Sequence, residues 1–214
     1  MTKRFLTGKS MPDTSLSYEV DEGINNVRLR FLVAAPLDYN DSDSAVINVF
    51  LDKQGHDREL AENNYQIQCY ESFDDKDFKH WAERTIKILY LSSISSFVHL
   101  GFGDLIKILD TCKGNNIIFR TFTANEIIKS RCIIDSLFGS PYILAFIASK
   151  DDLGMDEFRL LCDAISKYTD KSAQLRCAVF KWPDLQGTEV SLLYAEKAIT
   201  EENSNEQLTG FDRK

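Results

Sequence analysis

The clearest pattern of hydrophobic and polar positions lies between Tyr142 and Trp182. It begins with an unbroken apolar run from Tyr142 to Ala148, which has the length of a strand covered on both faces. From Met155 the apolar positions recur at steps of three and four, which predicts an amphipathic helix. From Ala173 the period changes to two, which predicts a second strand. We therefore expect a strand–helix–strand unit whose helix packs on the sheet.

The helix of this unit has one apolar and one polar face. Its apolar stripe consists of Met155, Phe158, Leu161, Cys162 and Ile165, and its polar face consists of Asp156, Arg159, Asp163 and Lys167. The stripe is centred on Phe158, which we expect to lie in the core. In the strand that follows, Leu175, Cys177 and Val179 point one way, and Arg176, Ala178 and Phe180 point the other.

Further helices and strands are predicted on both sides of the unit. A long helix runs from Asp75 to Ser93, and a shorter one buries Leu105, Ile108, Leu109 and Cys112. A strand over Asn116 to Phe122 precedes a helix from Thr123 to Phe138, and a last strand spans Glu189 to Ala198. The order from Asn116 onward suits an α+β fold, with a mixed four-stranded sheet and two helices on one face.

The first third of the chain has the pattern of a strand-rich block. Residues 17–72 contain three strand-like segments, at 27–31, 45–51 and 65–70. Turn-forming residues between the first two predict an antiparallel pair, and the acids among them suit a solvated turn better than a calcium loop. We expect residues 1–16 to form a flexible arm, 75–198 to form the main domain with its leading helix, and 199–214 to form a disordered tail.

Composition narrows the range of partners. The chain has 214 residues, of which 43% are hydrophobic and 27% charged, and its formal net charge of -8 argues against a nucleic-acid or anionic membrane surface. No apolar run approaches the roughly 20 residues that span a bilayer, and the first residues lack a signal-peptide pattern. Five widely spaced cysteines suit reduced thiols. We therefore expect a cytoplasmic protein that binds neither nucleic acid nor membrane.

The sequence contains no recognisable catalytic, cofactor or metal motif. Its ten glycines form no phosphate-binding loop, its three histidines are not at metal-ligand spacing, and no nucleophile elbow is present. His99 and Asp104 could make an acid–base pair, although a lone histidine beside a glycine turn more often has a structural role. We expect no catalytic residue, no cofactor and no metal.

From about Asp75 to Ala198, the chain resembles the C-terminal half of the bacterial tubulin homologue FtsZ. The segment Asp152-Leu153-Gly154-Met155-Asp156-Glu157-Phe158, after an apolar strand, carries the strongest part of the resemblance. Phe102-Gly103-Asp104-Leu105 stands where the family has a loop of the type N-x-D-F-A-D-hydrophobic. The resemblance implies the long core helix, the two-helix sheet and a contact loop that meets the next subunit of a filament.

The departures from the family bear on activity. The family's loop enters the nucleotide site of the next subunit, where its acids help to hydrolyse GTP. Asp104 matches the second acid, but Gly101 replaces the first acid and His99 replaces the asparagine. Residues 1–72 do not resemble the glycine-rich nucleotide domain and are too few for one, which needs on the order of 100 residues. The resemblance therefore implies the polymer-contact half without the GTPase.

Three functions remain open from the sequence. The first is a non-enzymatic protein that binds or caps an FtsZ- or tubulin-like cell-division filament through His99, Gly101, Phe102, Gly103 and Asp104. Phe102 suits a core anchor somewhat better than an exposed contact. The second is a scaffold that keeps only the fold and binds itself or another protein through a sheet edge. The third is an enzyme with a pocket between the strand-rich block and the long helix.

Overall fold

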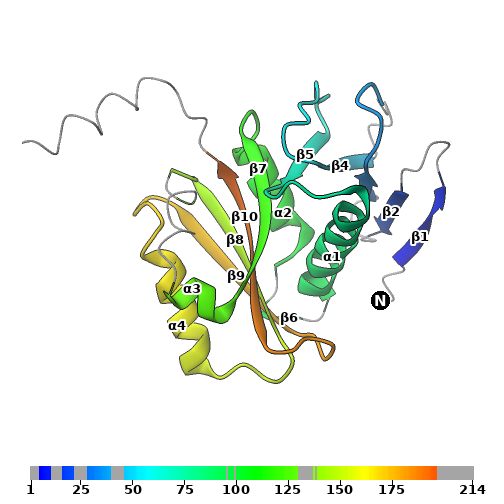
Figure 1. Cartoon of the computed structure of the whole chain (residues 1–214). Helices are drawn as coiled ribbons and strands as arrows, with labels where there is room; N and C mark the ends of the chain where they lie inside the picture. Colours follow the sequence, from blue (N-terminus) through cyan, green and yellow to red (C-terminus); the bar gives the residue numbers. More distant parts are fainter. Residues whose placement is uncertain are drawn as a thin grey trace, which may run out of the picture.

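One mixed β-sheet runs through the molecule and contains all ten strands found among the described residues (Figure 1). The computed structural model describes residues 5–10, 16–21, 28–39, 46–94, 96–98, 100–129, 137 and 139–196. The strands lie in the order β1-β2-β3-β4-β5-β7-β10-β8-β9-β6. Their bounds are β1 (Phe5–Ser10), β2 (Leu16–Asp21), β3 (Arg28–Val33), β4 (Val46–Asp52), β5 (Asn64–Cys69), β6 (Ser96–Val98), β7 (Asn116–Thr123), β8 (Tyr142–Ser149), β9 (Gln174–Lys181) and β10 (Thr188–Glu196). The helices are α1 (Asp75–Ile94), α2 (Phe102–Thr111), α3 (Ala124–Lys129) and α4 (Met155–Ser166).

Strand β8 is the centre of the C-terminal half. β10 lies antiparallel between β7 and β8, and β9 lies parallel to β8 with α4 as the crossover. Every residue of β8 is buried, because α3 and α4 cover one face of the sheet while α1 and α2 cover the other (Figure 1). Covering on both faces accounts for the unbroken apolar run of this strand. The predicted pair of helices on one face is present.

The extent of the sheet was predicted wrongly. The four strands β7, β10, β8 and β9 do not form a separate sheet, because β5 pairs with β7 in parallel and β6 pairs with β9. The β5–β7 pairing consists of Gln68 opposite Ile118 and Cys69 opposite Phe119. We call these two residue pairs the seam. Such a contact between segments far apart in sequence leaves no local pattern, so the hydrophobic periodicity did not reveal it.

The N-terminal strands also pair differently from the prediction. β3 and β4 are parallel, and so are β4 and β5. The turn-forming segment after β3 therefore does not close a hairpin. Its described residues pack on the face of the sheet that carries Leu32 and Phe50, which we call the outer face. Ala35 packs there against Leu32 and Phe50, and the ring of Tyr39 lies 6.2 Å from that of Phe50. The antiparallel pair predicted from the turn residues is therefore wrong, because β3 and β4 run in the same direction.

Arg58 lies in the connection from β4 to β5. It ties this connection to the described residues that follow β3. Its guanidinium forms an ion pair with Asp52, with an Nε–Oδ2 distance of 2.5 Å and side chains that are only 2% and 1% exposed. The same guanidinium donates to the carbonyl oxygens of Pro36, at 2.6 Å, and of Ala35. It also lies 4.4 Å from the centre of the Phe50 ring. We call this set of contacts the Arg58 clasp.

Some expectations fall at the margins of the described chain. Phe5–Ser10, inside the segment expected as a flexible arm, forms β1 and pairs antiparallel with β2. Helix α3 begins at Ala124 as its Thr123/Glu126 cap predicts, and residues 130–136 and 138 of the expected helix lie outside the described residues. The expected tail, 199–214, also lies outside them. In the described part of the chain, no helix combines the length and apolar character needed to cross a bilayer.

The burial of helices α1 and α2 follows the sequence pattern, whereas that of α4 follows it only in part. Phe78, Ala82 and Leu89 of α1 are buried, and so are the four apolar positions predicted for the short helix. In α4, however, Met155 is 66% exposed and Phe158 is only partly buried. Leu161 and Ile165, at 0% and 1% exposed, make the main contact with the sheet. The helix therefore packs through its second half.

Candidate functional site

The predicted contact loop forms the first turn of α2. Gly101 is the residue just before the helix, with φ -77° and ψ 166°, so it occupies extended backbone. Phe102 begins the helix and is only 5% exposed, packing into the core beneath α1 and α2. The interpretation of Phe102 as a core anchor agrees with this burial. His99 lies outside the described residues.

Asp104 turns back onto the loop. Its carboxylate accepts the backbone N–H of Gly101 at 3.2 Å, and its own N–H donates to the carbonyl oxygen of Gly101 at 3.0 Å. A carboxylate three residues into a helix that bonds back in this way satisfies one of the unpaired donors of the helix start. Asp104 therefore has a local structural role, whatever else contacts it.

Gly103 is the open position of this turn. It is exposed, and no atom lies within 4 Å of the place that a Cβ atom would occupy. The structure thus brings Gly101, Phe102, Gly103 and Asp104 together, with Phe102 facing the core and Gly103 facing outward. We call the outward side of these four residues the α2 surface.

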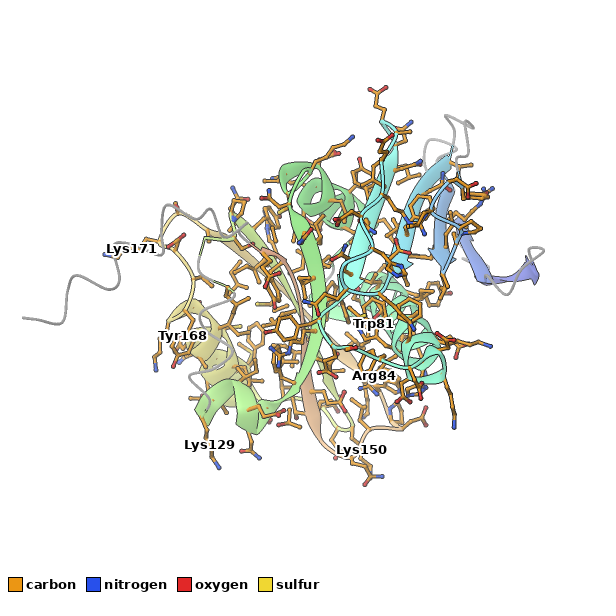
Figure 2. The ribbon with its side chains drawn as sticks, turned by 45° about the horizontal axis from the view of Figure 1, so that its top comes forward. Trp81, Arg84, Lys129, Lys150, Tyr168 and Lys171 are labelled. Atoms are coloured by element: carbon orange, nitrogen blue, oxygen red, sulfur yellow. The ribbon has the colours of Figure 1, made fainter. Side chains whose placement is uncertain are left out.

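A cleft of about 290 Å³ lies on the other side of α1, at the carboxyl end of β5. It is lined by the connection from β5 to α1, by one face of α1, and by Phe119, Arg120 and Thr121 of β7. Figure 2 shows Trp81 and Arg84 close together on α1, two of the four residues through which this helix borders the cleft; the others are Asp77 and His80. The sequence pattern assigned Trp81 to the buried face of the helix, whereas its side chain is only partly buried.

Trp81 and Arg84 tie α1 to the sheet at this cleft. The indole Nε1–H of Trp81 donates to the carbonyl oxygen of Phe119 at 3.3 Å. Arg84 forms an ion pair with Glu189 of β10, and its guanidinium lies 5.1 Å from the centre of the Trp182 ring. Burial lowers the pKa of Arg84, because leaving water disfavours the charged guanidinium.

Arg120 borders the cleft from the opposite side. Its guanidinium lies 4.1 Å from the ring of Tyr70 and 4.7 Å from the ring of Phe122, so two aromatic rings hold it. Within the described ranges, no carboxylate forms an ion pair with it. The rim also carries the acids Glu71 and Asp77, so the cleft presents both signs of charge.

The cleft occupies the position of the pocket considered for an enzyme, but its side chains are not arranged as a catalytic pair. His80 is exposed, and among the described residues it makes no hydrogen bond with Asp77 or Glu71. A general base needs a partner that orients it, and a nucleophile needs a base within reach. The described part of the chain also contains no cluster of three His, Cys, Asp or Glu side chains that could hold a metal ion.

Comparison with known proteins finds a likeness in fold alone. The sequence matches no known protein family and no curated protein. Among solved structures, the chain is similar to FtsZ from M. jannaschii, in a structure described as an empty dimer, with a TM-score of 0.51 and 13% sequence identity. A Trp-to-Tyr mutant of the same FtsZ gives a TM-score of 0.45, at 14% identity, over 62% of this chain and 46% of that one.

The match is partial on both sides. The alignment with the empty FtsZ dimer covers 72% of this chain and 55% of the FtsZ chain, so this chain corresponds to about half of an FtsZ. At this level of identity the comparison shows a shared FtsZ-like fold. The resemblance seen in the sequence is therefore supported at the level of the fold.

Proposed function

We propose that this protein is a non-catalytic, FtsZ-like protein that binds or caps the end of an FtsZ- or tubulin-like filament through the α2 surface. The observation that carries the proposal is the open first turn of α2 at Gly103 on an FtsZ-like fold. In the resembled family, the loop at this position makes the contact along the filament. A chain that presents this loop, and in whose 214 residues no phosphate loop is found, would occupy a subunit end and block the next addition.

Two further features support a role in binding instead of catalysis. The chain has no glycine-rich phosphate loop, and of the family's paired loop acids it keeps only Asp104. Asp104 is engaged in capping α2, which leaves its carboxylate less available for orienting a water molecule. In this proposal the protein acts in the cytoplasm, its partner is a filament subunit, and it needs no cofactor or metal.

A scaffold that assembles with itself is the second candidate, and the edge of the sheet at β9 favours it. β6 pairs with β9 only at Phe180 and Val179, so the edge from Gln174 to Ala178 has no neighbouring strand among the described residues. An unpaired edge can accept a strand from another chain. Sedimentation velocity over a range of protein concentrations tests this candidate, because self-assembly would raise the sedimentation coefficient.

Inhibition of FtsZ polymerisation, measured by light scattering, tests the filament proposal. The parent chain should inhibit assembly, and Gly103→Arg should raise the concentration needed for half-inhibition by about tenfold, a loss of about 1.4 kcal/mol in binding. A long cation at this position would project into the partner. Gly103→Ala is the matched control and should inhibit as the parent does, since its added methyl group meets no atom within 4 Å.

Stability must be measured alongside inhibition. Neither change at Gly103 should lower the melting temperature, because both residues form helix more readily than glycine. Asp104→Ala removes the cap of α2 and should cost about 1 kcal/mol of stability, so its effect on inhibition is interpreted only after that loss is known. A parent chain that does not inhibit, or equal inhibition by the Gly103→Arg variant, would exclude the α2 surface as a filament contact.

A further inference from the structure

Two cysteines meet between α4 and the strand that follows it. The Sγ atoms of Cys162 on α4 and Cys177 on β9 are 3.5 Å apart, and both thiols are free and partly exposed. The contact follows from the crossover geometry of this unit. α4 lies on the face of β9 that carries Leu175, Cys177 and Val179, so the alternation of the strand brings Cys177 beneath the helix.

The two sulfur atoms are in non-bonded contact, near enough to form a disulfide after a small movement. The bond requires about 2.0 Å, so a relative shift of about 1.5 Å would bring the sulfur atoms into bonding distance. The two cysteines are 15 residues apart in the sequence. The core already holds α4 and β9 side by side. The folded structure therefore already holds the two thiols in contact.

The two thiols of the pair differ in acidity. The hydrogen bond from the Cys177 thiol lowers the pKa of Cys162, although burial and Asp163 act against this shift. The same hydrogen bond and burial raise the pKa of Cys177. A thiolate is the form that attacks a disulfide, so the lowered pKa favours Cys162 over Cys177 for the first attack.

The other described cysteines lack these features. Cys69 and Cys112 are both 0% exposed, and burial raises the pKa of each thiol, to about 11 for Cys112. Neither is in contact with another cysteine sulfur in the part of the chain described here. Cys132 lies outside the described residues. The pair between α4 and β9 is therefore distinguished by proximity and by access to solvent.

We propose that Cys162 and Cys177 are a modification site. A low-molecular-weight disulfide such as oxidised glutathione oxidises the two thiols to a reversible disulfide bond that links α4 to β9. The Cys162 thiolate attacks one sulfur of oxidised glutathione, forms a mixed disulfide and releases one glutathione thiolate. The Cys177 sulfur, losing its proton, then attacks the Cys162 sulfur and releases the second glutathione. The two protein thiols are oxidised, oxidised glutathione is reduced, and the two protons leave on the two glutathione molecules.

Tryptic mapping of the native protein tests the linkage directly. Cleavage after Arg159 and Arg176 places the two thiols in the peptides Leu160–Lys167 and Cys177–Lys181, each with one cysteine. After equilibration with oxidised glutathione, we expect these two peptides to be joined, and dithiothreitol should separate them. Cys132→Ser is the matched control and should give the same joined peptide.

Thermal unfolding tests the fastening. A closed loop of this size constrains the unfolded chain, and the oxidised parent should melt about 6–12 °C above the reduced parent. Cys162→Ser and Cys177→Ser should each abolish both the joined peptide and this rise, and their reduced melting temperatures show whether they fold. The proposal would be overturned if the joined peptide formed only in denaturant, if Cys132→Ser removed it, or if oxidation left the parent's melting temperature unchanged.

Discussion

At the scale of single residues, Arg58 shows how one side chain can hold two loop segments together. Parallel strands are usually connected by helices that cover the sheet. Here the described residues of the connections on either side of β4, 34–39 and 53–63, contain no helix, and the Arg58 clasp holds them against the outer face. The guanidinium bonds Asp52 and two backbone carbonyl oxygens at once, so the buried Asp52 carboxylate has a cationic partner.

Removing the guanidinium should therefore be costly. Arg58→Met keeps most of the side-chain length but leaves the Asp52 carboxylate buried without a cation. Breaking a buried ion pair in this way typically costs about 3–5 kcal/mol, which denaturant unfolding can measure.

The matched control for this change is Lys53→Met. It removes a partner of the fully exposed Asp75 carboxylate, where water can replace the lost contact. The denaturation midpoint of the Lys53→Met variant should be nearly unchanged. A similarly small effect of Arg58→Met would show that the clasp contributes little to stability.

The residue scale also shows which parts of the candidate site a sequence can reveal. The burial of Phe102 follows from its place at the start of an amphipathic helix. Asp104 lies three residues after Gly101, a spacing that suits a helix cap, whereas the family resemblance implied an acid of the filament contact at this position. For the cleft beside Trp81, the sequence predicted only an approximate position, because its lining comes from two stretches of the chain, 70–84 and 119–121, that are far apart in sequence.

At the scale of elements, α4 shows where periodicity alone misleads. The apolar stripe predicted Met155 and Phe158 as core residues, yet the helix approaches the sheet at its second half. Periodicity defines the face of a helix that turns inward, but the tilt of the helix on the sheet decides how deeply each turn is buried. That tilt depends on the neighbouring strands, and no local pattern encodes it.

The difference in burial between the first and second halves of α4 can be measured. Leu161→Ala should cost about 2–5 kcal/mol, because Leu161 is 0% exposed and packs against the sheet. Phe158→Ala should cost less, since its ring is already partly in solvent. Asp163→Ala, on the exposed face, should change stability by less than about 0.5 kcal/mol. A larger loss for Phe158→Ala than for Leu161→Ala would contradict the burial described here.

At the scale of the whole molecule, the existence of most strands and helices was predictable, whereas their pairing was not. The strands β5, β7 and β8 and the helix α1 appear close to their predicted bounds. The union of all strands in one sheet depends on the seam, a contact between residues about fifty positions apart in the chain. Parallel pairing of β3 with β4 likewise depends on packing across the outer face.

The absence of phosphate-loop patterns from the sequence leads to a prediction for the whole chain. Titration calorimetry with GTP and Mg²⁺ should detect no binding, because backbone N–H groups that approach a phosphate need clustered glycines. An intact FtsZ measured under the same conditions is the positive control. A dissociation constant in the micromolar range would contradict both this prediction and the proposed division of roles between the chain and its partner.

The seam has a consequence for how the sheet can bend. Two residue pairs join β5 to β7, with the cleft of about 290 Å³ beyond one end of the seam and a hollow of about 160 Å³, lined by Tyr65, Lys113 and Asn116, beyond the other. A rotation of the N-terminal strands in the plane of the sheet about this short junction would widen one space while narrowing the other. The two spaces therefore lie on opposite sides of one short junction, and a change in the angle between β5 and β7 would alter both of them together.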